Sequence, residues 1–218
     1  MKLLILGGTR FVGRHMTEAA LEAGHEVTLF NRNRQGTDLG VETLVETLVG
    51  DRLHDVSALT GRTWDAVIDV SAYTPAAARR SAEALRETAA HYTFISTISV
   101  YKSFAGLGLD EQAPVAVLSD EDAEAAALSE PVSAEAYGPL KARCEGVVRG
   151  IFPDGALVIR PGLIVGPYDY TDRFTYSTGC GVSGRAGPFW LRGLPNSGYS
   201  SSTPTTSPAG RCRRPGAA

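Results

Sequence analysis

The stretch KLLILGGTRFVG, residues 2–13, changes its hydrophobic pattern twice within twelve residues, which leaves few folds open to the chain. Leu3–Leu6 is a short apolar run, typical of a strand buried on both faces. Two glycines follow at once, where a backbone can turn tightly. From Phe11 the apolar residues recur at helical spacing, and Gly24 predicts the end of that helix. Strand, glycine turn and helix together are the context of a dinucleotide-binding fingerprint.

The fingerprint departs from the G-x-x-G-x-x-G pattern at one position, where Arg10 replaces the middle glycine. We expect Gly7 to form the turn, Gly8 to leave room near the phosphates and Gly13 to let the helix pack closely. The helix N-terminus would then present unpaired N–H groups to a pyrophosphate. The alternative is an ordinary strand–turn–helix with incidental glycines. The candidate cofactor contacts in this turn are Gly7, Gly8, Thr9, Arg10, Phe11, Val12 and Gly13.

A second strand is predicted at Glu26–Phe30, and it is followed by Asn31-Arg32-Asn33-Arg34. This position, about 20 residues past the glycines, is where a Rossmann sheet reads the adenosine ribose. A carboxylate there would hold the 2′-hydroxyl of NAD, but Asn31 is neutral and Arg32 is cationic. With Arg10 on the adjoining turn, the residues favour the 2′-phosphate of NADP over NAD. The alternative is that these arginines are solvated loop residues.

Further strands are predicted at 44–49, 64–70, 92–97 and 156–160, and further helices at 75–90 and 137–149. Six strands that alternate with helices predict an α/β fold, a doubly wound parallel Rossmann sheet of order 3-2-1-4-5-6. Asp51 follows the third strand and could accept from an adenine amino group or cap a helix. Small residues at 71–72 would let a cofactor lie close to the backbone. The segment 103–130 is predicted to be an insertion that holds a solvated helix capped by Ser119, or alternatively a lid.

Tyr137 and Lys141 are the strongest candidates for chemistry, because four residues of helix place both on one face. A nearby ammonium favours the phenolate and lowers the pKa of a tyrosine, which suits it to general acid–base work. A hydroxyl at the end of the fifth strand, Thr97 or its neighbour Ser96, could bond the same substrate oxygen. Lys141 could also hold a nicotinamide ribose. The alternative is an exposed helical Tyr–Lys pair.

Charge divides the chain into two parts. Residues 1–176 carry 16 basic and 24 acidic side chains, a net charge of −8, whereas residues 177–218 carry five arginines and no acid. We predict a dinucleotide-binding Rossmann domain over 1–176 and an irregular Gly/Ser/Pro-rich tail over 177–218. We expect the abrupt change to mark a frameshift or a misjoined end, so that a C-terminal substrate domain is truncated or garbled, with a native flexible tail as the alternative. Translating the downstream DNA in the other two frames tests this.

Composition excludes several classes of function. No apolar run is long enough to span a membrane, and three cysteines without metal spacing indicate a reduced cytoplasm. None of the four histidines has a ligand spacing, so no metal site is predicted, and Cys144 is predicted to be a packing residue. The acidic balance of residues 1–176 argues against nucleic acid as a partner. A small-molecule substrate is expected, and a homodimer is left open.

The chain resembles the extended short-chain dehydrogenase/reductase superfamily, in its NAD-dependent epimerase/dehydratase group. The resemblance spans residues 1 to about 176 and depends on GGTRFVG, VGDR, FISTISVY, YGPLK and RPGLIVGP, with GGTR similar to an atypical, reductase-like subgroup. It implies a catalytic Thr97, Tyr137 and Lys141. It also implies cofactor contacts at the 7–13 turn and, beyond it, at Asn31, Arg32, Asp51, Arg52, Val70, Ser71, Ala72, Tyr137, Lys141 and Pro161.

The activity that the resemblance implies is NAD(P)-dependent oxidoreductase or epimerase chemistry at a hydroxyl or keto group, on a substrate such as a nucleotide sugar. Proton transfer at the substrate oxygen would accompany hydride transfer with the cofactor. Relatives that bind RNA stem-loops suggest the rival interpretation, a non-catalytic NAD(P)-binding regulatory or RNA-associated protein.

Overall fold

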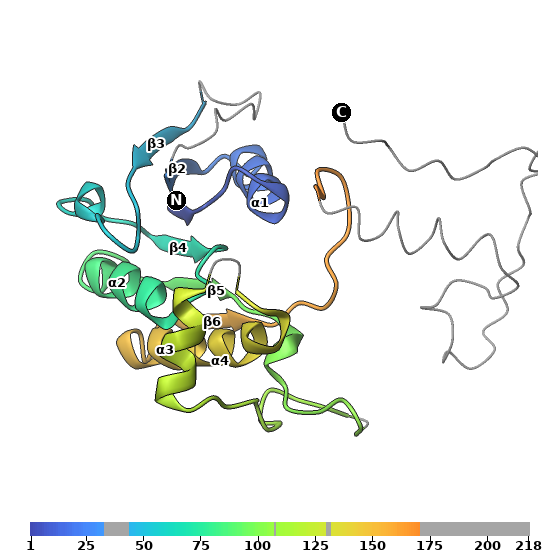
Figure 1. Ribbon diagram of the computed structural model, residues 1–218. Helices are drawn as coiled ribbons and strands as arrows, with labels where there is room; N and C mark the ends of the chain where they lie inside the picture. The colour runs from blue at the N-terminus through green and yellow to red at the C-terminus, as the bar shows by residue number, and fades with distance from the viewer. Residues whose placement is uncertain (33–43, 107, 130–131, 171–218) are drawn as a thin grey trace, which may run out of the picture. The chain divides into compact units, whose positions relative to one another are not determined.

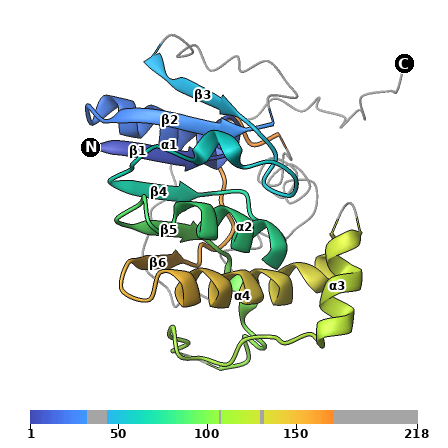
Figure 2. The same ribbon diagram turned by 90° about the vertical axis from the view of Figure 1, so that its left-hand side faces the viewer.

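Six parallel strands form the centre of the computed structural model, which describes residues 1–32, 44–106, 108–129 and 132–170. The sheet order is β3-β2-β1-β4-β5-β6, as the sequence predicted. Figure 2 shows the strands stacked in this order, from β3 at the top to β6 at the bottom. The strands are β1 (Lys2–Leu6), β2 (Glu26–Asn31), β3 (Glu46–Val49), β4 (Ala66–Asp69), β5 (Tyr92–Ile95) and β6 (Ala156–Ile159).

Helices cover both faces of this sheet. Helix α1 packs on one face, and α2 and α4 pack on the other (Figures 1 and 2). This is the three-layer, doubly wound arrangement that parallel strands require, because each crossover helix must bury its apolar side against the sheet. The helices are α1 (Phe11–Glu22), α2 (Pro75–Leu85), α3 (Asp120–Leu128) and α4 (Ala134–Ile151), with short 3-10 turns η2 (Ser57–Leu59) and η3 (Ile98–Val100).

Strand β1 shows why the sheet is buried on both sides. Leu4 and Leu6 belong to the core beneath α2 and α4, whereas Leu3 and Ile5 belong to the core beneath α1. Successive side chains point to opposite faces, so a continuous apolar run fills two cores at once. Full burial of each such side chain contributes roughly 1.5–3 kcal/mol.

Capping residues set the helix starts. Thr74 Oγ1 accepts from the Ala77 amide at the start of α2, and Pro75 occupies the first turn. Helix α4 begins at Ala134, three residues before the predicted start, because Ser133 Oγ accepts from the Ala136 amide (3.3 Å). Tyr137 therefore lies within the first turns of α4 and not at its first residue.

Helix α3 is largely exposed, as the sequence predicted. Ser119 caps it as expected, its Oγ accepting from the Asp122 amide at 3.0 Å. Ala123 is buried against Ala136 and Leu140 of α4, however, so one side of the helix forms a small core of its own. Within the described residues, no helix is both long and apolar enough to cross a membrane.

Candidate dinucleotide-binding and catalytic site

The glycine turn after β1 has the backbone that the motif predicts. Gly7 and Gly8 both have positive φ, +110° and +84°, a conformation that other residues rarely adopt. A Cβ at Gly13 would lie 2.7 Å from the Gly8 amide nitrogen, so the first turn of α1 packs directly on the loop. The buried Thr17 hydroxyl contacts the carbonyls of Gly8 and Gly13, each at 2.9 Å, and fixes this approach. The motif glycines thus bring α1 against the strand end.

The N-terminus of α1 suits an anionic group. Arg10 occupies the N-cap position in extended conformation, and among the described residues its side chain makes no capping hydrogen bond. The first turn also holds no acidic residue. Its leading N–H groups and partial positive charge are therefore suited to a pyrophosphate, with Phe11 and Val12 in the first turn and Thr9 just before the N-cap. The start of α1 therefore fits the pyrophosphate of a dinucleotide.

The turns after β1 and β4 touch each other. A Cβ at Gly7 would lie 2.7 Å from Val70 Cγ2, and Ser71 Oγ donates to the Leu6 carbonyl at 3.1 Å. The strand order reverses between β1 and β4, which is where ligands bind in open α/β sheets. Val70, Ser71 and the fully buried Ala72 thus lie at the expected crevice.

The structure describes three of the residues predicted for the adenosine end, Asn31, Arg32 and Arg10. Asn31 ends β2 and its carbonyl accepts from the Gly50 amide at 3.0 Å, while Arg32 is exposed at the strand end. Arg10 lies with its guanidinium 5.6 Å from the Tyr170 ring centroid. Asn33 and Arg34 fall outside the described residues.

Asp51 and Arg52 make contacts within the protein. Asp51 Oδ1 accepts from the Leu53 amide at 3.0 Å, closing a local turn. Arg52 Nη1 donates to both oxygens of Asp69, at 3.0 and 3.1 Å. Its buried Nη2 has no hydrogen-bond partner among the described residues.

Ser99 links the Thr97 segment to helix α4. Thr97 Oγ1 accepts from the Ser99 amide at 3.1 Å and bonds the Ser99 hydroxyl at 3.2 Å, capping η3. A Cβ at Gly138 would overlap the Ser99 carbonyl oxygen, so only glycine allows α4 to come this close. The residue before Gly138 is Tyr137, a half-buried side chain whose ring lies 6.2 Å from that of Tyr73.

Lys141 is buried one helical turn beyond Tyr137. Its Nζ donates to the carbonyls of Ala72, after β4, and Ile95, at the end of β5, at 3.0 and 2.6 Å. The ammonium also lies 4.1 Å from the centroid of the Phe94 ring. Burial lowers the pKa of Lys141 to about 8, against an ordinary value of 10.5. The lysine therefore joins the ends of two neighbouring strands, β4 and β5.

Sequence reasoning missed a second buried polar group at this edge of the sheet. Glu145 accepts from Ser96 Oγ at 2.6 Å and from two nitrogens of Arg160, at 2.9 and 2.6 Å. The Ser96 hydroxyl is thereby committed to Glu145, which leaves Thr97 as the candidate hydroxyl at the end of β5. The spacing of Glu145, four residues after Lys141 on the same helix face, was the available signal.

The other predicted residues take structural places. The Pro161 carbonyl accepts from the Ile98 amide at 3.0 Å, which ties the segment after β6 to η3. Burial raises the pKa of the Cys144 thiol to about 12, consistent with the predicted packing role. Among the described residues, no group of His, Cys, Asp and Glu could hold a metal ion.

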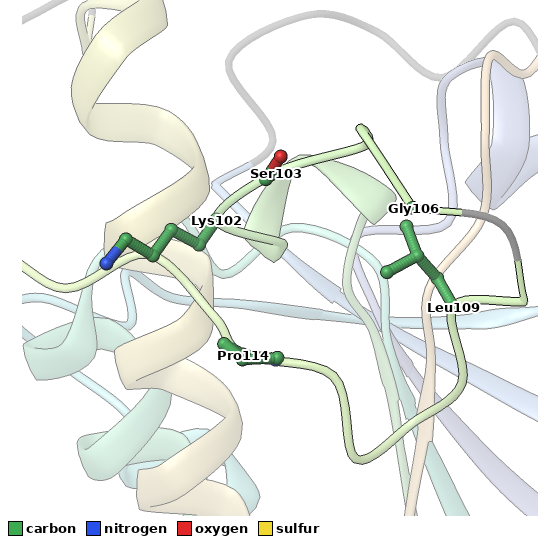
Figure 3. A pocket seen from close by; sticks show the side chains of 5 residues that line it. All are labelled: Lys102, Ser103, Gly106, Leu109 and Pro114. Carbon is green, nitrogen blue, oxygen red and sulfur yellow. The ribbon is translucent and has the colours of Figure 1, made fainter.

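A shallow surface hollow of about 280 Å³ lies away from these residues, in the segment between η3 and α3. Figure 3 shows Lys102 extending away from Leu109 and Gly106. Ser103 and Pro114 complete the lining, and no predicted site residue takes part. The hollow therefore contributes nothing to the candidate site.

A family model matches most of the chain. The model of the NAD dependent epimerase/dehydratase family matches residues 3–177, and the chain belongs to this family. A search of curated protein sequences finds no match.

Solved structures with the same fold include three of modest identity. UDP-galactose 4-epimerase is 22% identical (TM-score 0.62; 77% of this chain, 58% of that chain). dTDP-glucose 4,6-dehydratase from Bacillus anthracis, in complex with NAD, is 16% identical (TM-score 0.61; 79% and 58%). Pal from Bacillus thuringiensis is 20% identical (TM-score 0.63; 78% and 59%). The chain thus spans less than two-thirds of the length of each.

Proposed function

We propose that this protein is an NAD(P)-dependent oxidoreductase or epimerase-type enzyme that acts on a hydroxyl or keto group of a nucleotide sugar. The observation that carries the proposal is the position of Lys141. Its Nζ is hydrogen-bonded to the ends of β4 and β5, at the edge where the glycine turn and the β4 turn meet. Tyr137 stands one turn earlier on the same helix, so three elements converge on one place.

Tyr137 is proposed to exchange a proton with the substrate oxygen. Lys141 supplies a positive charge one helical turn away, which favours the phenolate that remains when the proton has left. The Thr97 hydroxyl donates to the hydroxyl of the exposed Ser99 at 3.2 Å. It would turn from Ser99 and donate to the substrate oxygen instead. Tyr137 and Thr97 would then hold the oxygen while it gains or loses charge, and Lys141 would supply positive charge nearby.

The dinucleotide would lie along the carboxyl ends of the strands, from the α1 N-terminus to Lys141. When bound, its nicotinamide supplies hydride transfer at the carbon that carries the reacting oxygen. The leading amides of α1 would hold the pyrophosphate, and Val70, Ser71 and Ala72 would support the rest. We propose NADP as the preferred form, because Arg10 and Arg32 offer two guanidiniums and Asn31 no carboxylate.

The substrate class is proposed from the fold relatives. Two of them are UDP-galactose 4-epimerase and dTDP-glucose 4,6-dehydratase, and their names specify nucleotide sugars as substrates. The family match supports the reaction class to which epimerases and dehydratases belong.

Calorimetric titration with NAD and NADP, each oxidised and reduced, is the first test. We expect one site per chain and tighter binding of NADP. The dinucleotide-loaded protein is then incubated with UDP-galactose, UDP-glucose and dTDP-glucose, and sugar carbons are followed by NMR. Absence of binding for all four dinucleotides would refute the proposal, whereas binding without turnover would refute only the substrate class.

A further inference from the structure

Asp69, the last residue of β4, is a fully buried carboxylate that sequence reasoning did not single out. Both of its oxygens accept from Arg52 Nη1, and Oδ2 also accepts from the Tyr92 hydroxyl at 2.8 Å. Oδ1 accepts from the amides of Ser71 and Ala72, at 3.1 and 3.2 Å. A buried charge is tolerated only when it is paired and hydrogen-bonded, and Asp69 meets both conditions.

A single residue, Ala72, bridges Asp69 and the ammonium of Lys141. The Ala72 amide donates to Asp69, and the Ala72 carbonyl accepts from Lys141 Nζ at 3.0 Å. Ala72 is fully buried, so water has no access to replace either bond. The carboxylate thus fixes the turn, and the turn fixes one of the two carbonyls that hold the lysine.

The charges around Lys141 also link Asp69 to its ammonium. Burial lowers the pKa of Lys141, and Asp69 is the foremost neighbour that opposes this effect, followed by Cys144 and Glu145. Arg52 acts in the opposite direction, because its guanidinium repels the ammonium. The rings of Phe94 and Tyr73 also lie near the ammonium, which is 4.1 and 5.8 Å from their centroids.

We propose that Asp69 is the positioning residue for Lys141: it fixes the turn after β4 whose carbonyl receives the lysine ammonium, and it balances the charge of that ammonium across the turn. The value of this arrangement to catalysis rests on the proposed function. The placement of Lys141 by Asp69 does not depend on the proposed function, and it is tested without measuring turnover.

The test follows the titration of Lys141 by NMR of the lysine ¹³Cε resonances in the full chain. The chain has only three lysines, Lys2, Lys102 and Lys141, so Lys2→Arg and Lys102→Arg assign the signals. We expect Asp69→Asn to lower the midpoint of the Lys141 titration and Arg52→Gln to raise it. Opposite shifts from two partners of one ion pair would not arise from general loosening of the fold.

Asp65→Asn is the matched control, the same change at the other end of the β4 region, where Asp65 accepts from the Lys2 amide at the surface. It should leave the Lys141 midpoint where it is. An unchanged midpoint in Asp69→Asn, or shifts of the same sign in Asp69→Asn and Arg52→Gln, would overturn the proposal. If Asp69→Asn does not fold by circular dichroism, Arg52→Gln decides alone: a rise supports the proposal, and a fall or no change refutes it.

Calorimetry with dinucleotide keeps the two proposals apart. A chain that binds no dinucleotide defeats the proposed function and leaves the lysine titration intact. In a chain that binds and turns over, Asp69→Asn should lower kcat at pH 7 more than it raises KM for the cofactor.

Discussion

At the scale of single residues, two phenols lie beside the buried lysine. The rings of Tyr73 and Tyr137 are 6.2 Å apart with an angle of 40° between their planes, and Tyr73 is half exposed. Only Tyr137 lies on the face of α4 that also carries Lys141. The two hydroxyls can therefore be separated by experiment, since one is proposed to move a proton and the other is not.

Tyr137→Phe is expected to lower kcat by about 10²–10⁴-fold, the usual contribution of a general acid or base. The affinity for dinucleotide, measured by calorimetry, should change little, because the ring remains. Tyr73→Phe makes the same chemical change one ring away and should retain activity. Equal losses in the two variants, or loss of cofactor binding in Tyr137→Phe, would contradict the role assigned to Tyr137.

Arg32 belongs to the same scale, because it is proposed to select the cofactor. Arg32→Ala should weaken NADP binding by about tenfold, the loss of one charge-assisted contact, while NAD binding changes little. Calorimetry with the two dinucleotides measures the ratio. A ratio that stays constant would assign Arg32 to the solvated loop that the sequence left as the alternative.

At the scale of elements, α4 carries three glycines in different surroundings. Gly138 faces the Ser99 carbonyl with no room for a Cβ, whereas Gly146 and Gly150 have nothing within 4 Å of that position. The close approach at Gly138 sets the distance between α4 and η3, and with it the position of Tyr137 relative to Thr97. The same substitution on one helix should therefore give opposite results.

Gly138→Ala should destabilise the fold by about 1–3 kcal/mol, because the methyl group forces α4 away from η3. Gly146→Ala and Gly150→Ala should stabilise it by roughly 0.5–1 kcal/mol, since alanine is the better helix former in open space. Urea unfolding followed by circular dichroism measures all three. A neutral Gly138→Ala would show that the helix approach is not set by this glycine.

Sequence alone predicted the elements better than their contacts. Hydrophobic period and glycine position gave the six strands, and their order followed from the topology of doubly wound sheets. The start of α4 was predicted late because Ser133, outside the Y-x-x-x-K motif, provides the cap. The pairing of Arg52 with Asp69 joins residues 17 apart in the chain, and no local pattern indicates which buried carboxylate a guanidinium will meet. Arg52 was therefore predicted only as a cofactor contact.

At the scale of the whole molecule, the buried charges near Lys141 couple folding to pH. The lysine has a pKa of about 8 in the fold and an ordinary value of 10.5. Between these values the unfolded chain binds a proton that the folded chain has released, so stability rises with pH. Burial raises the pKa of Cys144 to about 12 from 9.0, which makes the thiol act in the opposite sense above pH 9. The effect of the lysine is therefore clearest between pH 8 and 9.

Lys141→Met should remove this dependence. In that pH window, the unfolding free energy of the natural chain should rise by about 1 kcal/mol per pH unit relative to the variant. Below pH 8 the difference between the two proteins should level off, because Lys141 is then protonated in both the folded and the unfolded chain. Urea unfolding of both proteins at half-unit steps from pH 7 to 9 measures the difference. Parallel curves would mean that Lys141 titrates as an ordinary exposed lysine, and the buried bridge between the β4 and β5 ends, from which the proposed chemistry was argued, would lose its physical basis.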